Sequence, residues 1–122
     1  MPVTLLWSYG NQYVIAEIKN ATYSDVCKKV GNGNETTGRT ALEAIAGKTD
    51  PIATDFTPIN ILRTQLPDAM VTVYTYKPLV GMLTMTDPRG EVTKYDYDSF
   101  GRLNKVTQAD KVIESYLYHY KN

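Results

Sequence analysis

The sequence predicts an α+β fold: an antiparallel β-hairpin array, a meander of about five to seven strands, with an insertion of short helices covering one face. A pair of tyrosines recurs at an interval of 21 positions (95 − 74 and 116 − 95). Turn-forming residues separate the apolar segments around these pairs, and the segment before them has a helical pattern instead. A period of this length with aromatic residues two apart is typical of repeated β-hairpins.

The chain of 122 residues is long enough for one domain, 1–122, with a single core. It divides into N-terminal strands (2–19), a helical and loop insertion (20–68) and repeated hairpins (70–120). Thirteen basic and thirteen acidic residues balance, which argues against a nucleic-acid partner. No apolar run approaches the ~20 residues that span a bilayer, so we expect no membrane insertion.

The N-terminal segment alternates as a pair of strands does. Val3, Leu5 and Trp7 fall on one face of the first strand, and the second strand follows Gly10 and Asn11, which indicate a turn.

The insertion predicts three short helices, 24–30, 40–47 and 56–66. Ser24 and Thr40 are the expected N-caps of the first two, and Gly31 ends the first. The polar, glycine-rich stretch 31–38 between them reads as a loop. Pro58 is expected in the first turn of the third helix.

The connections in the repeat zone have specific turn chemistry. Asp87, Pro88 and Gly90 occupy the positions that a type I turn followed by a left-handed residue prefers, and Asp98 and Gly101 repeat this frame. We take these five residues as turn-defining. Such short connections require antiparallel neighbours.

The tyrosine pairs are Tyr74 and Tyr76, Tyr95 and Tyr97, and Tyr116 and Tyr118. Each pair shares one face of its strand, because side chains two apart point the same way. The opposite face of the second copy carries Lys94 and Asp96, so we expect that face in solvent and the tyrosine face buried. The helical segment is the expected cover for these tyrosines.

The segment from Tyr95 to Leu103, YDYDSFGRL, resembles the YD repeat, Y-x-Y-D-x-x-G-R-L, of bacterial RHS proteins. The resemblance covers residues 71–120, and a weaker similarity extends back to residue 4. In that weaker part, Trp7 and Tyr9 take the places of the tyrosine pair. The first copy departs from the pattern after Tyr76, where the Asp is missing and the Gly comes one residue later.

The RHS family implies a large β-rich scaffold that is secreted or attached to the cell surface. We therefore expect a non-enzymatic structural module, the C-terminal part of a larger extracellular or surface protein, with no signal peptide in this chain. Two alternatives remain open. One is a carbohydrate-binding module, whose candidate residues are Tyr74, Tyr95, Tyr97, Tyr116 and Tyr118. The other is part of a toxin-encapsulating shell.

No constellation of residues supports an enzyme. Asp96 and Asp98 are close enough for a carboxylate pair but read as strand and turn residues. His119 is the only histidine and Cys27 the only cysteine, so we expect no metal site and no cofactor. The partners we expect are neighbouring repeats, a second copy paired through the sheet edges, or glycans. Alternatively, residues 2–19 seal an edge of the array.

Overall fold

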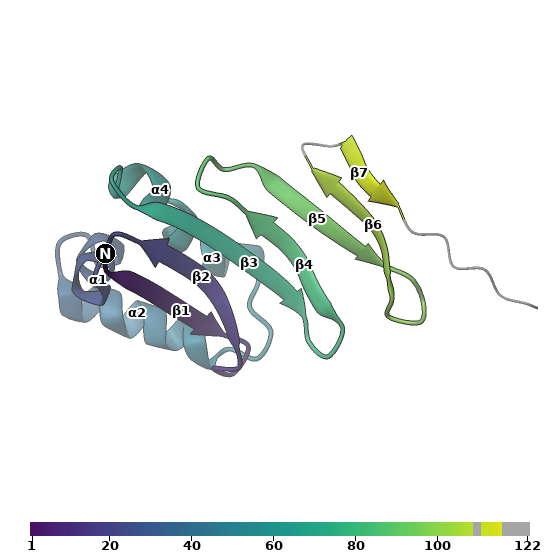
Figure 1. The fold of residues 1–122 in the computed structure, drawn as a ribbon. Coiled ribbons are helices and arrows are strands. Elements are labelled where there is room, and N and C mark those ends of the chain that lie inside the picture. Colours follow the sequence, from purple (N-terminus) through teal and green to yellow (C-terminus); the bar gives the residue numbers. More distant parts are fainter. Residues whose placement is uncertain (109–110, 116–122) are drawn as a thin grey trace, which may run out of the picture.

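The structure is a computed structural model and describes residues 1–108 and 111–115. It is a single antiparallel sheet in which the strands lie in the order of the sequence, with a helical segment between the second and third strands (Figure 1). The prediction of an α+β fold with an antiparallel hairpin meander is confirmed. The strands are β1 (Val3–Ser8), β2 (Tyr13–Lys19), β3 (Met70–Lys77), β4 (Gly81–Thr86), β5 (Val92–Tyr97), β6 (Leu103–Gln108) and β7 (Lys111–Ser115). The helices are α1 (Tyr23–Val30), α2 (Glu35–Gly47), α3 (Ala53–Asn60) and α4 (Leu62–Gln65).

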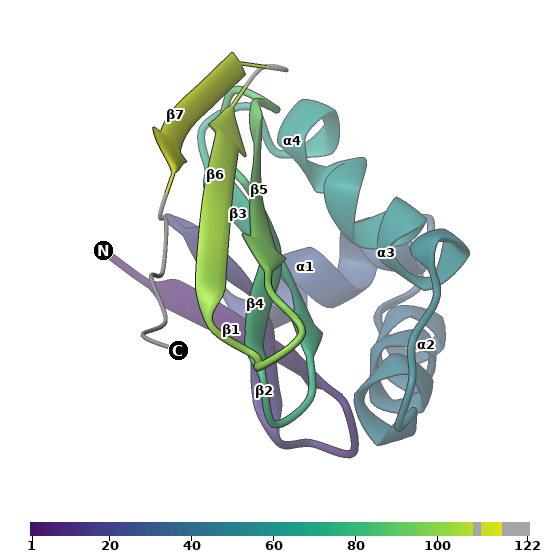
Figure 2. The same cartoon turned by 90° about the vertical axis from the view of Figure 1, so that its right-hand side faces the viewer.

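All four helices lie on the same side of the sheet, as Figure 2 shows. They bury alternate residues of the first three strands, and the buried positions are apolar in β2 and β3 but include Thr4 and Ser8 in β1. The strand side of this core includes Leu6, Ile18, Val71 and Val73; the helix side includes Val26, Cys27, Leu42, Ile45, Phe56, Ile59 and Leu62.

The helices begin earlier than the sequence predicted. Thr22, not Ser24, caps α1: its hydroxyl accepts a hydrogen bond from the Asp25 amide, and the Asp25 carboxylate accepts one from the Thr22 amide. Asn34 caps α2 by accepting from the Thr37 amide at 3.0 Å, so Thr40 lies inside the helix. The predicted loop over 31–38 is therefore wrong for its second half, because an asparagine cap starts the helix within it.

The two glycines that bound this stretch have a packing role. A Cβ atom at Gly38 would overlap the Cys27 carbonyl, and one at Gly31 would overlap the Asn34 carbonyl. Helices α1 and α2 cross where only glycine lets the backbones approach this closely. The sequence GNGNETTG is thus the contact between two helices.

The third helix also begins earlier than predicted. Asp55 accepts a hydrogen bond from the Ile52 amide at 2.8 Å and pairs with Lys48, which fixes the helix start at Ala53. Pro58 therefore lies inside α3. The helical path resumes as α4, whose Leu62 is fully buried.

The expectation that the helices cover the row of repeat tyrosines is wrong, although Tyr76 packs against the helix-covered core. Under the helices β3 presents Val71 and Val73, and Tyr74 alternates to the other face. The expectation that the face opposite Tyr95 and Tyr97 meets solvent is confirmed, because Lys94 and Asp96 are exposed. Further along the sheet the buried side changes: Thr93, on the face away from the helices, is only 5% exposed. Sequence alternation shows that two faces differ, but not which of them a distant segment covers.

Candidate functional site

The most regular feature of the molecule is the connections between its strands, and the two aspartate turns are the clearest case. Asp87 Oδ1 accepts hydrogen bonds from the amides of Arg89 and Glu91, both at 2.9 Å. Asp98 Oδ1 accepts from the amides of Phe100 and Arg102, at 2.9 and 3.0 Å. Each aspartate thus replaces a missing backbone partner inside its turn.

The glycines of these turns have the conformation that the frame requires. Gly90 and Gly101 have φ values of 87° and 75°, and each donates its amide hydrogen bond to the carbonyl of the aspartate three residues before. Pro88 stands second in its turn, where its fixed φ is favourable. The two turns therefore repeat one geometry at a distance of 11 residues (98 − 87).

Arg102, the arginine of the YD motif, supports the second turn. Its Nε donates to Asp98 Oδ2 at 3.0 Å, and its guanidinium lies 5.4 Å from the centre of the Phe100 ring. Burial alone would raise the pKa of Asp98, but the amides of Arg102 and Phe100 and the Arg102 guanidinium lower it overall. The motif residues Asp98 and Arg102 therefore act on each other within the turn.

Each hairpin also has a β-bulge at the same place. The pairing shifts between Leu6 and Trp7 in the first hairpin, between Thr75 and Tyr76 in the second, and between Asp96 and Tyr97 in the third. In every case the extra residue lies in the second strand of the hairpin. A bulge at a repeated position bends and twists each hairpin in the same way.

Adjacent hairpins pair with each other over only part of their length; we call these contacts seams. At the β2–β3 seam, Ala16–Lys19 pairs with Met70–Val73. At the β4–β5 seam, Thr84–Thr86 pairs with Val92–Lys94. Beyond these residues the strands separate toward the hairpin turns, as is visible between β4 and β5 in Figure 1.

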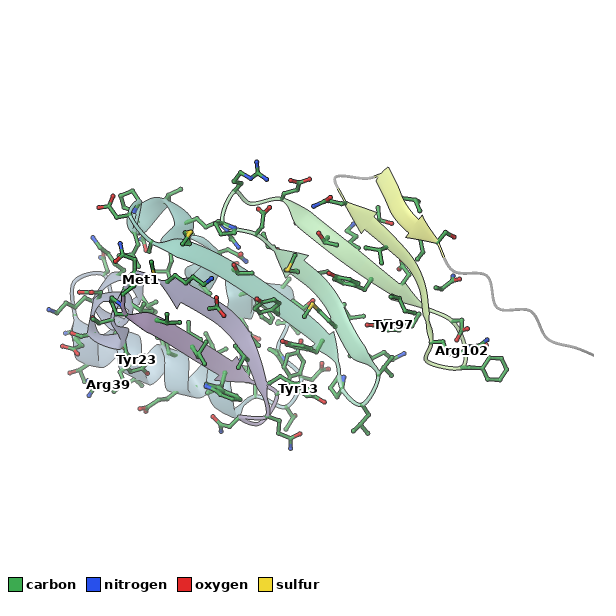
Figure 3. All side chains as sticks on the ribbon, viewed as in Figure 1. Met1, Tyr13, Tyr23, Arg39, Tyr97 and Arg102 are labelled. Carbon is green, nitrogen blue, oxygen red and sulfur yellow. The ribbon has the colours of Figure 1, made fainter. Side chains whose placement is uncertain are left out.

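The second tyrosine of each described pair bridges the open half of its seam. The Tyr76 hydroxyl donates to the Val14 carbonyl across the β2–β3 seam, and the Tyr97 hydroxyl donates to the Met82 carbonyl across the β4–β5 seam, both at 2.7 Å. Tyr97 reaches from β5 toward β4 (Figure 3), and its hydroxyl lies against Gly81, where a side chain would collide with it. Burial raises the pKa of both phenols. The two acceptors are equivalent, since Val14 and Met82 both follow the turn of the preceding hairpin.

Two tyrosines outside the period complete the first seam. The Tyr9 hydroxyl accepts a hydrogen bond from the Tyr76 amide at 2.9 Å, which supplies the partner that β2 does not. The Tyr13 ring stacks on Tyr76, with 4.9 Å between the ring centres, and its hydroxyl accepts from the Leu79 amide. In the sequence Tyr9 and Tyr13 flank the predicted turn at Gly10 and Asn11, and no other pattern indicated these roles.

The pairing of β1 with β2 shows how the first hairpin relates to the other two. Trp7 pairs with Val14, as Tyr76 pairs with Met82 and Tyr97 with Leu103. Trp7 is therefore equivalent to the second tyrosine of a pair, and Leu5 to the first. The predicted correspondence, with Trp7 first and Tyr9 second, is displaced by two residues from this register.

The candidate glycan-binding tyrosines do not form one exposed row. Tyr74, Tyr95 and Tyr97 are half-buried, and the Tyr97 hydroxyl is already bonded across its seam. Tyr116 and Tyr118 lie outside the described residues, as does His119.

Within residues 1–108 and 111–115 no group of three or more His, Cys, Asp or Glu side chains could hold a metal ion. Over the same residues no helix is long and apolar enough to cross a bilayer. Cys27 is a buried free thiol in the core.

These hairpins and seams define a class of protein, the repeat scaffold built from β-hairpins. Residues 79–113 match the family model described as RHS Repeat. The predicted resemblance to the RHS/YD-repeat family is thereby confirmed for this segment, which spans β4, β5, β6 and the start of β7. Comparisons with curated proteins and with solved structures found no match.

Proposed function

We propose that this chain is a non-enzymatic structural β-scaffold module of an RHS/YD-repeat protein of the cell surface or the secreted fraction. The observation that carries the proposal is the repetition of one seam: Tyr76 to Val14 and Tyr97 to Met82 are the same contact made twice. A contact that recurs with the sequence period serves the array as a whole.

The proposal predicts that the array can be lengthened by one period. A copy of residues 87–107 inserted after Thr107 keeps the native frame, because Thr107 is one period of 21 residues after Thr86. We expect the longer chain to fold and unfold cooperatively, with a urea m value roughly a sixth larger, since m follows the surface exposed on unfolding. Circular dichroism and urea unfolding measure this.

A matched control is the same insertion lacking Thr93. One missing strand residue turns every following side chain to the opposite face, so this variant should lose the added cooperativity. If both insertions unfold alike, with the m value of the original chain, the repeat does not act as a modular scaffold.

The proposal includes an extracellular location for the protein that contains this module. RHS repeats occur in surface or secreted proteins, which supports an extracellular site for the parent of this module. Protease treatment of intact bacteria that make the parent protein tests this: cleavage within the module is expected, and protection until lysis would contradict an extracellular location.

Carbohydrate binding is the second candidate. It is supported by Tyr74 and Tyr95, which are half-buried on the face away from the helices. A glycan array probed with the chain and with its Tyr74→Ala variant tests it, because a specific signal must weaken when the ring is removed. A signal that both proteins give equally would count against these tyrosines.

A further inference from the structure

The free edge of β1 lacks the devices by which proteins protect an exposed strand. Val3–Ser8 contains neither a charged residue nor proline, and Val3, Leu5 and Trp7 are 52%, 44% and 42% exposed. Natural edge strands usually carry a lysine, a proline or an inward charge that prevents pairing with another strand. Among the described strands, β1 has β2 as its one partner.

A cleft of about 280 Å³ lies beside this edge, between β1 and the helices α1 and α2. Buried core side chains form its floor, among them Leu6, Ile15 and Leu42. Trp7 and Tyr23 also line it; Figure 3 shows Tyr23 on the helical side. The volume is just below the ~300–1,000 Å³ of typical small-molecule sites, and an apolar pocket next to a free strand edge suits a side chain of an added strand.

The seams inside the chain show what such an added strand would be. The positions in β1 equivalent to Val71–Val73 and Val92–Lys94, counted from Trp7, Tyr76 and Tyr97, are residues 2–4. Those segments pair with the second strand of the hairpin before them. Pro2 comes just before the strand, a position where proline is tolerated.

Trp7 corresponds to the tyrosines that bridge the other two seams. Tyr76 packs against the core and donates to a carbonyl of the preceding hairpin. Trp7 lines the cleft that opens on the same core, and its indole is a hydrogen-bond donor only. The two internal seams therefore indicate how a third seam at β1 would form. An antiparallel strand of a preceding hairpin would pair with β1, and the Trp7 side chain would donate a hydrogen bond to its backbone.

We propose that the edge of β1 is a strand-addition site for one further hairpin of the same repeat type. The second strand of that hairpin pairs with residues 2–4, one of its apolar side chains fills the cleft, and Trp7 Nε1 donates to its backbone. The proposal rests on the scaffold function above and names the partner of its N-terminal edge.

The test adds such a hairpin to the full chain and uses Trp7, the one tryptophan of the sequence, as the reporter. A copy of residues 70–90 placed before Met1 is in frame, because Pro2 then follows as Val92 follows Gly90 and Glu91. We expect a blue shift of the tryptophan emission and at least a twofold loss of acrylamide quenching. The control fusion lacks Thr84 of the added copy and should show neither change.

Two variants of the fusion localise the effect. Val3→Pro removes a main-chain donor from the middle of the proposed seam, at a residue that alternates with the β2-facing Pro2, and should restore the emission of the unfused chain. Val112→Lys, on the last described strand β7, where Val112 is 55% exposed, should leave the blue shift unchanged. Circular dichroism of both variants checks that the sheet is retained.

Three results would overturn the proposal. The first is an unchanged emission in the fused chain; if the internal insertion of residues 87–107 is nevertheless tolerated, the scaffold function stands and only the β1 site fails. The second is a blue shift that Val3→Pro does not remove. The third is a blue shift of the unfused chain that grows with protein concentration, which would make a second copy the occupant.

Discussion

Arg63 of α4 donates a hydrogen bond from Nε to the carbonyl oxygen of Asp87, at 2.9 Å, in the turn between β4 and β5. Its Nη2 reaches the Thr86 carbonyl at 3.0 Å, and Nη1 bonds to the Asn60 side chain. Burial lowers the pKa of Arg63, against the nearby charge of Asp87. A single side chain thus joins the helical insertion to the RHS repeat.

Replacing Arg63 by alanine should destabilise the protein by about 1.5–3 kcal/mol, the usual range for hydrogen bonds to a charged group. The measurement is urea unfolding at neutral pH. Arg89→Ala, an exposed arginine in the neighbouring turn, is the control and should change stability by less than about 0.5 kcal/mol. Equal effects of both changes would show that Arg63 does not join the two parts.

Replacing Leu79 by glycine should stabilise the protein. Pro78 and Leu79 are the central residues of a turn closed by the hydrogen bond from Val80 N to Lys77 O, and Leu79 has φ of 67°. This left-handed conformation costs a residue with a Cβ atom about 1–2 kcal/mol, and glycine avoids that cost. Part of the gain is offset because a glycine chain loses more conformational entropy on folding. A gain of roughly 0.5–1 kcal/mol in unfolding free energy is expected. Leu79→Ala keeps the strain and should give no such gain.

Replacing Gly38 by alanine should destabilise the protein by about 1–3 kcal/mol, because the new methyl group overlaps the Cys27 carbonyl and the helices must move apart. Gly47, at the end of the same helix, has open space at its Cβ position. Gly47→Ala should therefore be neutral or slightly stabilising. Thermal unfolding of the two variants side by side checks the difference; similar losses would refute the close crossing.

Removing the hydroxyl of Tyr97 should cost about 1 kcal/mol, since it leaves the Met82 carbonyl without this donor. Tyr97→Phe retains the ring in the seam, so the fold should survive. Tyr95→Phe is the matched control in the same strand and should have little effect. A Tyr97→Phe protein as stable as the original would show that the ring, and not the hydrogen bond, holds the seam.

Stability should fall above about pH 10, the ordinary pKa of a phenol. Burial raises the folded-state pKa of Tyr9, Tyr76 and Tyr97, so the folded chain keeps protons that the unfolded chain has already lost. Their contribution is complete below the unfolded-state pKa and disappears as the pH rises through the folded-state pKa. Urea unfolding over this pH range, with tyrosinate absorbance as the titration signal, should show a smaller decline in Tyr97→Phe, because one of the shifted phenols is absent.

The parts of this fold that depend on local rules could be predicted from the sequence. The turns at Asp87 and Asp98 follow from residues that suit only a few backbone conformations, and the hairpin order follows from those turns. The covered face could not be predicted, because Val71 and Tyr74 are both apolar enough to be buried and the choice depends on a helical segment that lies elsewhere in the chain. The contact of Arg63 with Asp87, 24 residues apart, has no local signal at all.

The half-paired seams also determine the angle between neighbouring hairpins. Neighbouring hairpins are paired at one end of a seam and separated by a tyrosine ring at the other, so their strands diverge. The size of the ring then sets the angle between the two hairpins. Both internal seams open toward the hairpin turns, so each turns the next hairpin in the same sense. Changing tyrosine to tryptophan or phenylalanine along the row should alter the angle between hairpins without altering the strand order.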